Sequence, residues 1–174
     1  MNLYAYAGNN PISFDDPFGL CPIEKDGVPC HIYVTAYGAQ HGAKLSALQP
    51  RARHALYELA QQSGHDLGVN ATTNGTHSDP RHNGVDASNP ARSNPKLSGL
   101  AVDIGEVDHK TVGANFAADL QVQYAAQVSP QTKAVIDPYL YVNASQPGAT
   151  KEPVDDPATL REHRDHPHMH VSVW

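Results

Sequence analysis

The sequence predicts an α+β fold, in which a small, mainly antiparallel sheet carries helices packed on one side and is surrounded by long loops. Apolar residues alternate over several short segments, as in strands, and recur at helical spacing over two longer ones. The chain has 174 residues, a length that suits one compact domain with at most a short appendage. Its 14 Pro and 13 Gly indicate that long connections separate the regular elements.

The first half of the chain contains two predicted strands and one predicted helix. Residues 31–37 alternate enough for a short strand. An apolar repeat at helical spacing covers Arg51–Gln62, and Gly64 ends it. Leu67–Thr73 is predicted as a strand that runs into a polar segment. That segment, residues 74–98, is longer than a structural connection requires, so we expect it to serve function.

The second half continues the same alternation of elements. A helix is predicted over Val112–Val128, and a polar connection over Ala144–Arg161. The buried face of this helix is expected to carry Phe116, Ala117, Leu120 and Tyr124, which recur at helical spacing. The predicted strands are Leu97–Ile104, Val135–Val142 and His168–Trp174.

Charge and hydropathy exclude several classes of protein. The formal net charge is −6, and no basic stripe with interleaved aromatic residues is present, so we expect no nucleic-acid partner. No apolar run approaches the roughly 20 residues that span a bilayer, so we expect no membrane insertion. The N-terminus lacks the basic start and the apolar stretch of a signal peptide, so we expect no export signal of its own.

The two cysteines, Cys21 and Cys30, are separated by a short segment that contains one Gly and two Pro. A turn there could bring the two sulfur atoms together in a disulfide, which would stabilise the fold by about 2–3 kcal/mol. Free thiols are the alternative. A zinc site with His31 is less favoured, because a fourth ligand is not evident.

Potential metal ligands occur in three separated segments: residues 76–82, 98–105 and 165–171. A catalytic zinc site uses three protein ligands and leaves one position open for water. In a strand, His166, His168 and His170 would point to the same face. Asp103 lies in an otherwise apolar strand, where a carboxylate is costly unless a cation pairs with it.

The first 20 residues resemble the end of an Rhs-repeat core. Such a core ends in a proline, four further residues and Asp-Pro-x-Gly-Leu. Every fixed place of this motif is filled here, by Pro11, Asp16, Pro17, Gly19 and Leu20. The resemblance implies that residues 1–20 belong to the shell of an Rhs parent protein and that residues 21–174 form its C-terminal toxin domain. It further implies a secreted antibacterial effector, such as a type VI secretion effector, with a cognate immunity protein.

Two later segments resemble the D-Ala-D-Ala carboxypeptidase and L-alanyl-D-glutamate endopeptidase family, which belongs with the lysostaphin-type and hedgehog-type zinc folds. The family pattern is Ser-x-His-x-x-Gly-x-Ala-x-Asp, followed downstream by an acid-x-x-His. Here Gly99, Ala101 and Asp103 match the first part, and Asp165 and His168 match the second. The resemblance implies that Asp103 and His168 bind zinc, that Asp165 is the general base, and that the neighbouring His170 serves catalysis.

The first histidine of the family pattern is displaced in this chain. Where the family has it, before the strand, this sequence has Lys96, which cannot bind zinc while it is charged. The nearest histidine in a similar local context is His82, which would be followed by an insertion over 83–98. We therefore expect His82 to be the first zinc ligand, with His77 as the alternative.

The last ligand also has two candidates. We expect His168, because Asp165 precedes it by three residues, as the family pattern requires. Some relatives instead use the second histidine of a His-x-His pair as the ligand and the first as a proton carrier. In that version His170 would bind zinc, and His168 would be the acid/base.

Together these features predict a zinc peptidase that cleaves peptide bonds in peptidoglycan stem peptides, with long loops around a zinc cleft. It would act in the periplasm of a target bacterium, a compartment in which disulfides persist. Two alternatives remain open: a metal-dependent nuclease toxin, and a non-catalytic zinc fold that binds the cell wall or a partner.

Overall fold

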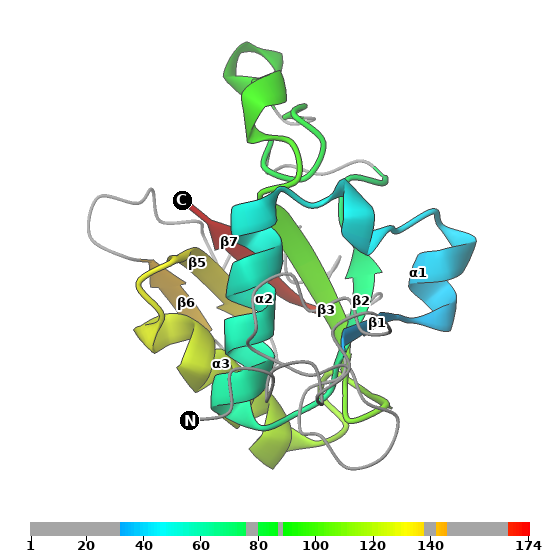
Figure 1. Cartoon of the computed structure of the whole chain (residues 1–174), viewed down its shortest axis with the longest axis vertical. Coiled ribbons are helices and arrows are strands. Elements are labelled where there is room, and N and C mark those ends of the chain that lie inside the picture. Colours follow the sequence, from blue (N-terminus) through cyan, green and yellow to red (C-terminus); the bar gives the residue numbers. More distant parts are fainter. Residues whose placement is uncertain (1–31, 76–79, 87–88, 138–141, 146–166) are drawn as a thin grey trace, which may run out of the picture.

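The computed structural model describes residues 32–75, 80–86, 89–137, 142–145 and 167–174, and it shows a mixed α/β fold (Figure 1). Its elements are β1 (Ile32–Val34), α1 (Ala36–Gln40), η2 (Leu45–Ala47), α2 (Pro50–Ser63), β2 (Leu67–Ala71), η3 (Pro90–Arg92), η4 (Pro95–Leu97), β3 (Ala101–Val107), β4 (Lys110–Thr111), α3 (Phe116–Val128), β5 (Thr132–Asp137), β6 (Val142–Ser145) and β7 (Met169–Val173). The sheet order is β1-β2-β3-β7-β5-β6, with β4 paired to β3. Among the described strands only β1 and β2 pair in parallel. The mostly antiparallel sheet confirms the coarse prediction.

Helix α2 agrees closely with the sequence. Pro50 occupies the first helical position, where its missing N–H costs nothing, and Gly64 ends the helix in the left-handed region at φ 74°. The buried face consists of the predicted apolar residues, among them Leu56 and Leu59. None of the helices in the described part of the chain is long and apolar enough to cross a membrane.

The core lies between the sheet and the pair of helices α2 and α3, which pack against each other in front of it (Figure 1). Leu56 of α2 and Val122 of α3 share this core with Val102 of β3 and Val171 of β7. Because side chains alternate along a strand, residues next to these valines point to the opposite face of the sheet.

The predicted orientation of α3 is wrong. Phe116, Leu120 and Tyr124 were expected to be buried with Ala117, but they are 62%, 44% and 64% exposed. The helix instead buries Ala118, Val122, Ala125 and Ala126, together with two polar side chains. Both sets recur at helical spacing, and the face of small residues lets α3 approach α2 and the sheet closely.

Several strand boundaries also differ from the prediction. The strand expected over 31–37 is described only from Ile32 to Val34, because Thr35 caps α1 and its side chain accepts a hydrogen bond from the backbone N–H of Gly38. The strand expected over Leu97–Ile104 begins later, at Ala101, because Leu97 belongs to η4. The strand expected over Val135–Val142 corresponds to β5 and β6, which pair in an antiparallel manner.

Candidate metal centre

Two neighbouring strands bring the first two candidate ligands together. In the antiparallel pair of β3 and β7, Asp103 stands directly opposite His170. Their sequence neighbours Val102 and Val171 face the core, so Asp103 and His170 lie on the sheet face away from α2 and α3. Both side chains are buried, with residue exposures of 5% and 6%.

A third ligand, His82, comes from the connection between β2 and β3. Its backbone carbonyl accepts a hydrogen bond from Gly99 N–H at 2.8 Å, which ties this connection to the start of β3. Its ring Nδ1 lies 2.6 Å from the carbonyl oxygen of Thr72. A carbonyl can only accept, so Nδ1 carries the proton and the lone pair of neutral His82 is on Nε2. His82 is 1% exposed.

Thr72 is itself held in place by two further contacts. Its N–H donates to the side-chain oxygen of Asn74 at 2.8 Å, and its hydroxyl accepts from the N–H of Lys44 at 3.2 Å. These bonds fix the carbonyl that orients the His82 ring. Such a partner on the far nitrogen is the usual support of a metal-binding histidine.

The three side chains converge on one point. His82 Nε2 lies 3.2 Å from Asp103 Oδ1 and 3.2 Å from His170 Nδ1, and His170 Nδ1 lies 2.9 Å from the same oxygen. A tetrahedral metal with bonds of about 2.0–2.1 Å holds its ligand atoms roughly 3.3 Å apart. These separations are therefore close to the edges of such a tetrahedron. The buried group His82, Asp103 and His170 could hold a metal ion.

The donor set also fits a cation chemically. The lone pair on His82 Nε2 faces a carboxylate oxygen, a contact between two acceptors that needs a proton or a metal ion between them. Burial opposes the ionisation of Asp103. When a proton instead of a metal ion occupies His82 Nε2, the positive charges of His82 and His168, with hydrogen bonds from His170 and His82, outweigh burial and hold the pKa of Asp103 well below its usual range. The carboxylate is thus kept in the ionised form that a metal requires.

His168 stands beside this group. Its Nε2 lies 3.9 Å from Asp103 Oδ2, the oxygen that does not face the other two histidines, and its side chain is 11% exposed. The ligand atom that β7 contributes to the group is therefore on His170, as in the second version of the site considered above. The expected base Asp165, the alternative ligand His77 and the cysteine pair lie outside the described residues.

A second histidine cluster lies at the opposite end of β3. His65 Nδ1 is 2.8 Å from Asp108 Oδ2, and its Nε2 faces the side-chain oxygen of Gln121 in α3. Asp108 also accepts from the N–H of Asp66 at 3.1 Å. Asp108 and His109 form the turn to β4 with φ of 51° and 58°, a left-handed conformation that residues other than glycine rarely adopt. This cluster was not predicted from the sequence.

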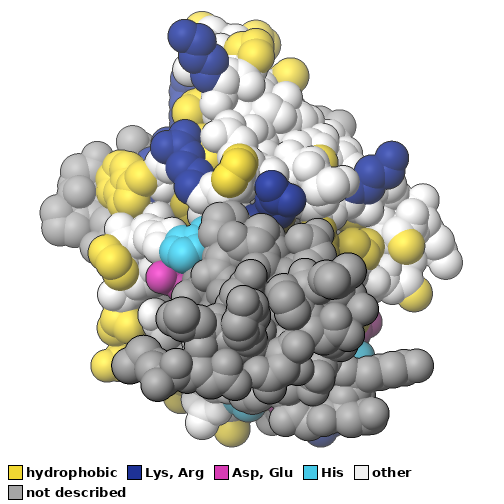
Figure 2. All heavy atoms as spheres, viewed as in Figure 1, with side chains coloured by type: hydrophobic (Ala, Val, Ile, Leu, Met, Phe, Trp, Pro, Cys, Tyr) yellow, Lys and Arg dark blue, Asp and Glu magenta, His cyan; other side chains and the backbone are white. Residues whose placement is uncertain are grey.

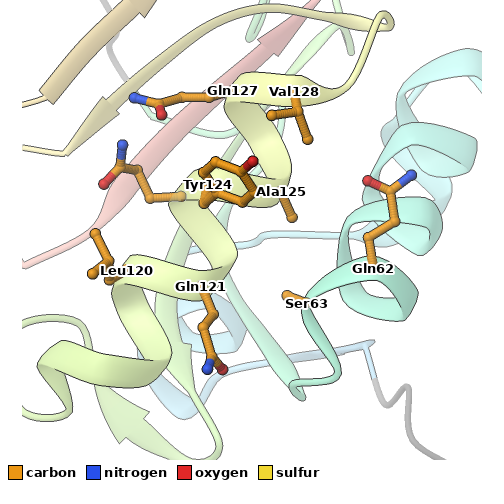
Figure 3. A pocket seen from close by; sticks show the side chains of 9 residues that line it. Gln62, Ser63, Leu120, Gln121, Tyr124, Ala125, Gln127 and Val128 are labelled. Atoms are coloured by element: carbon orange, nitrogen blue, oxygen red, sulfur yellow. The ribbon is translucent and has the colours of Figure 1, made fainter.

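A groove of about 620 Å³ lies between α2 and α3 (Figure 3). It is lined by the end of α2, including Gln62 and Ser63, and by exposed residues of α3, including Tyr124 and Val128. No candidate metal ligand lines it, so the groove and the metal group are separate features.

No protein-family model, curated protein or solved structure matches this chain.

Proposed function

We propose that this chain is the toxin domain of a secreted antibacterial effector and that it hydrolyses peptide bonds of peptidoglycan stem peptides with the help of zinc. The observation that carries the proposal is the convergence of three buried ligand atoms at separations of 2.9–3.2 Å. Two imidazoles and one carboxylate leave a tetrahedral metal one open position, which is the arrangement of hydrolytic zinc sites.

In this proposal His82, Asp103 and His170 hold the metal. Bound zinc would supply a water of lowered pKa and polarise the scissile carbonyl. Long loops around the zinc would form the substrate cleft.

His168 is then the side chain placed to move a proton. Its Nε2 is within 4 Å of the carboxylate of Asp103 but is not part of the convergent group. A base at this place would accept the proton of the attacking water and pass it to the leaving amine. Asp165 keeps the role that the family resemblance implies, as a second group able to carry this proton.

The resemblance of residues 1–20 to an Rhs core supports the biological setting. A toxin delivered to the periplasm meets peptidoglycan there, and a cognate immunity protein would protect the producing cell. The same compartment favours a disulfide between Cys21 and Cys30.

The test is mass spectrometry of purified peptidoglycan after incubation with the full chain, with and without a chelator, together with metal analysis of the protein. We expect new stem-peptide fragments that disappear when the metal is removed. His170→Ala should lose both zinc and activity, whereas His168→Ala should keep zinc and lose turnover. His41→Ala is the control, because His41 is exposed and contacts Tyr37 of α1, the helix that it caps.

Two results would contradict the proposal. Intact muropeptides from protein that holds stoichiometric zinc would refute the peptidase activity. If His168→Ala released the metal and His170→Ala retained it, the roles of the two histidines would be reversed, as in the first version of the site.

A further inference from the structure

Among the described residues, a group of basic residues lies near one end of β3 and three acidic residues lie near the other. Near its N-terminal end, the segments 44–53 and 80–98 contain six Lys and Arg residues: Lys44, Arg51, Arg53, Arg81, Arg92 and Lys96. We call these six residues the cationic end. Figure 2 shows Lys and Arg side chains gathering over the upper part of the face, around the start of α2 and the projection that carries η3 and η4. The C-terminal end of β3 carries Glu106 and Asp108, with Asp66 beside them.

Hydrogen bonds show that the two cationic segments lie side by side. The side chain of Gln49 donates to the carbonyl oxygens of Lys96 at 3.0 Å and Ser98 at 2.7 Å. The backbone N–H of Gln49 donates to the carbonyl of Gly99 at 2.9 Å. Gly99 in turn donates to the carbonyl of His82, so the backbone of these segments is bonded to that of a candidate metal ligand.

Acidic residues are scarce in these two segments. The one acidic residue in the two segments is Asp86, whose side chain is 0% exposed and accepts from the Asn89 N–H at 2.8 Å. It pairs with Arg92 Nε at 3.3 Å and so orders the projection, while the Arg92 side chain stays 56% exposed. Among the described residues, the structure shows no carboxylate paired with Lys44, Arg51 or Lys96, and all three are exposed.

The position of Arg51 and Arg53 is electrostatically unfavourable for folding. Both lie in the first turn of α2, which contains no acidic residue. The helix dipole places partial positive charge at this end, so cations there destabilise the helix. An anion bound beside Arg51 and Arg53 would offset this unfavourable interaction with the helix dipole.

We infer that the cationic end binds the carboxylates of the peptidoglycan peptide network and thereby guides an acidic peptide to the metal group. The inference rests on the proposed function and names the recognition surface of that site. Peptide rather than nucleic acid is favoured because the two segments contain no Phe, Tyr or Trp on which bases could stack. Concentrated charge of one sign beside a reaction site raises the rate at which an oppositely charged substrate arrives.

The test is pelleting of the 174-residue chain with intact peptidoglycan sacculi in the presence of a chelator, so that binding is measured without cleavage. Arg51→Gln with Lys96→Gln should weaken binding about tenfold, since two exposed charge contacts are lost. Lys110→Gln, an exposed cation in β4 at the other end of β3, is the matched control and should bind as the unmodified protein does. Raising NaCl from about 0.1 M to about 1 M, which shortens the Debye length from roughly 10 Å to 3 Å, should release the protein.

Repeating the pelleting assay with sacculi whose carboxylates have been converted to amides tests whether those carboxylates are the ligand. If they are, the modification abolishes binding. The inference is overturned by binding that survives amidation or high salt, by an equal effect of Lys110→Gln, or by stronger retention on duplex DNA than on sacculi. Suppose that the double variant loses binding, but the unmodified protein binds sacculi and never cleaves them. That result would refute only the peptidase activity. Cleavage with an unchanged KM in the double variant would refute only the role of the cationic end.

Discussion

Asp103→Asn is the sharpest test of the metal group, because it removes one charge and keeps the shape of the side chain. In the metal-free protein the substitution loses a buried charge-assisted hydrogen bond from His170 at 2.9 Å, which should cost about 1.5–3 kcal/mol of unfolding free energy. Zinc at about 100 times its dissociation constant should stabilise the unmodified protein by about 2.7 kcal/mol. For a chain of this size that corresponds to a rise in Tm of roughly 5–10 °C.

The assay is thermal unfolding after chelation and again after addition of zinc, with calorimetric titration to measure the affinity. Asp103→Asn should abolish most of the zinc-induced rise in Tm. Asp119→Asn is the control, since Asp119 is 1% exposed and accepts from the N–H of Gly113 at 2.8 Å, so its loss destabilises the fold without touching the metal group. An equal zinc response in Asp103→Asn and the unmodified protein would refute the assignment, as would the absence of any response in the unmodified protein.

Three further predictions concern the rest of the fold. Burial lowers the pKa of His65, but its amide and carboxylate partners raise it above the usual value, so the folded state holds the proton more tightly. The stability this provides is complete below the unfolded pKa near 6.5 and is lost as pH rises through the folded pKa, with a slope of at most about 1.4 kcal/mol per pH unit. Denaturant unfolding across this range should show the decline, and His65→Gln should flatten it. In the same assay, Val122→Ala should lower the free energy of unfolding by about 2 kcal/mol, because Val122 is buried, and Tyr124→Ser should hardly change it. Equal losses for the two variants would contradict the observed orientation of α3. A methyl group at Gly105 would overlap the side chain of Asn70, so Gly105→Ala should lower the free energy of unfolding by about 1–3 kcal/mol. Adding Asn70→Ala to the same chain should recover part of this loss, and strictly additive losses would contradict the contact.

The elements that could be predicted are those with local signals. Helix α2 has a proline at its first position and a glycine in the left-handed conformation after its last, and both act through the backbone alone. The face that α3 buries has no such signal. Phe116, Leu120 and Tyr124 share helical spacing with each other, but so do Ala118, Val122 and Ala125. Periodicity predicts a helix, whereas the buried face depends on which side chains fit the space beside α2.

The ligand from β7 shows the same limit within the site. His168 and His170 are two positions apart, so a strand places both on one face of the sheet and this periodicity does not distinguish them. The choice depends on strand register, because Asp103 stands opposite His170 and not opposite His168. Register arises from pairing between distant segments, which no local pattern contains.

His82 is the clearest case in which distance along the chain and distance in space differ. It lies far from Asp103 along the chain, yet the segment between them folds back on itself. Asn94 donates to the carbonyl of Gly84 at 2.8 Å, and Gly99 donates to the carbonyl of His82 at the same distance. These two bonds close the segment at its base and return the chain to β3. A segment closed in this way can carry exposed side chains, such as Lys96, while His82 stays close to Asp103. Two of the six residues of the cationic end, Arg92 and Lys96, therefore come from the segment that returns the chain from His82 to β3.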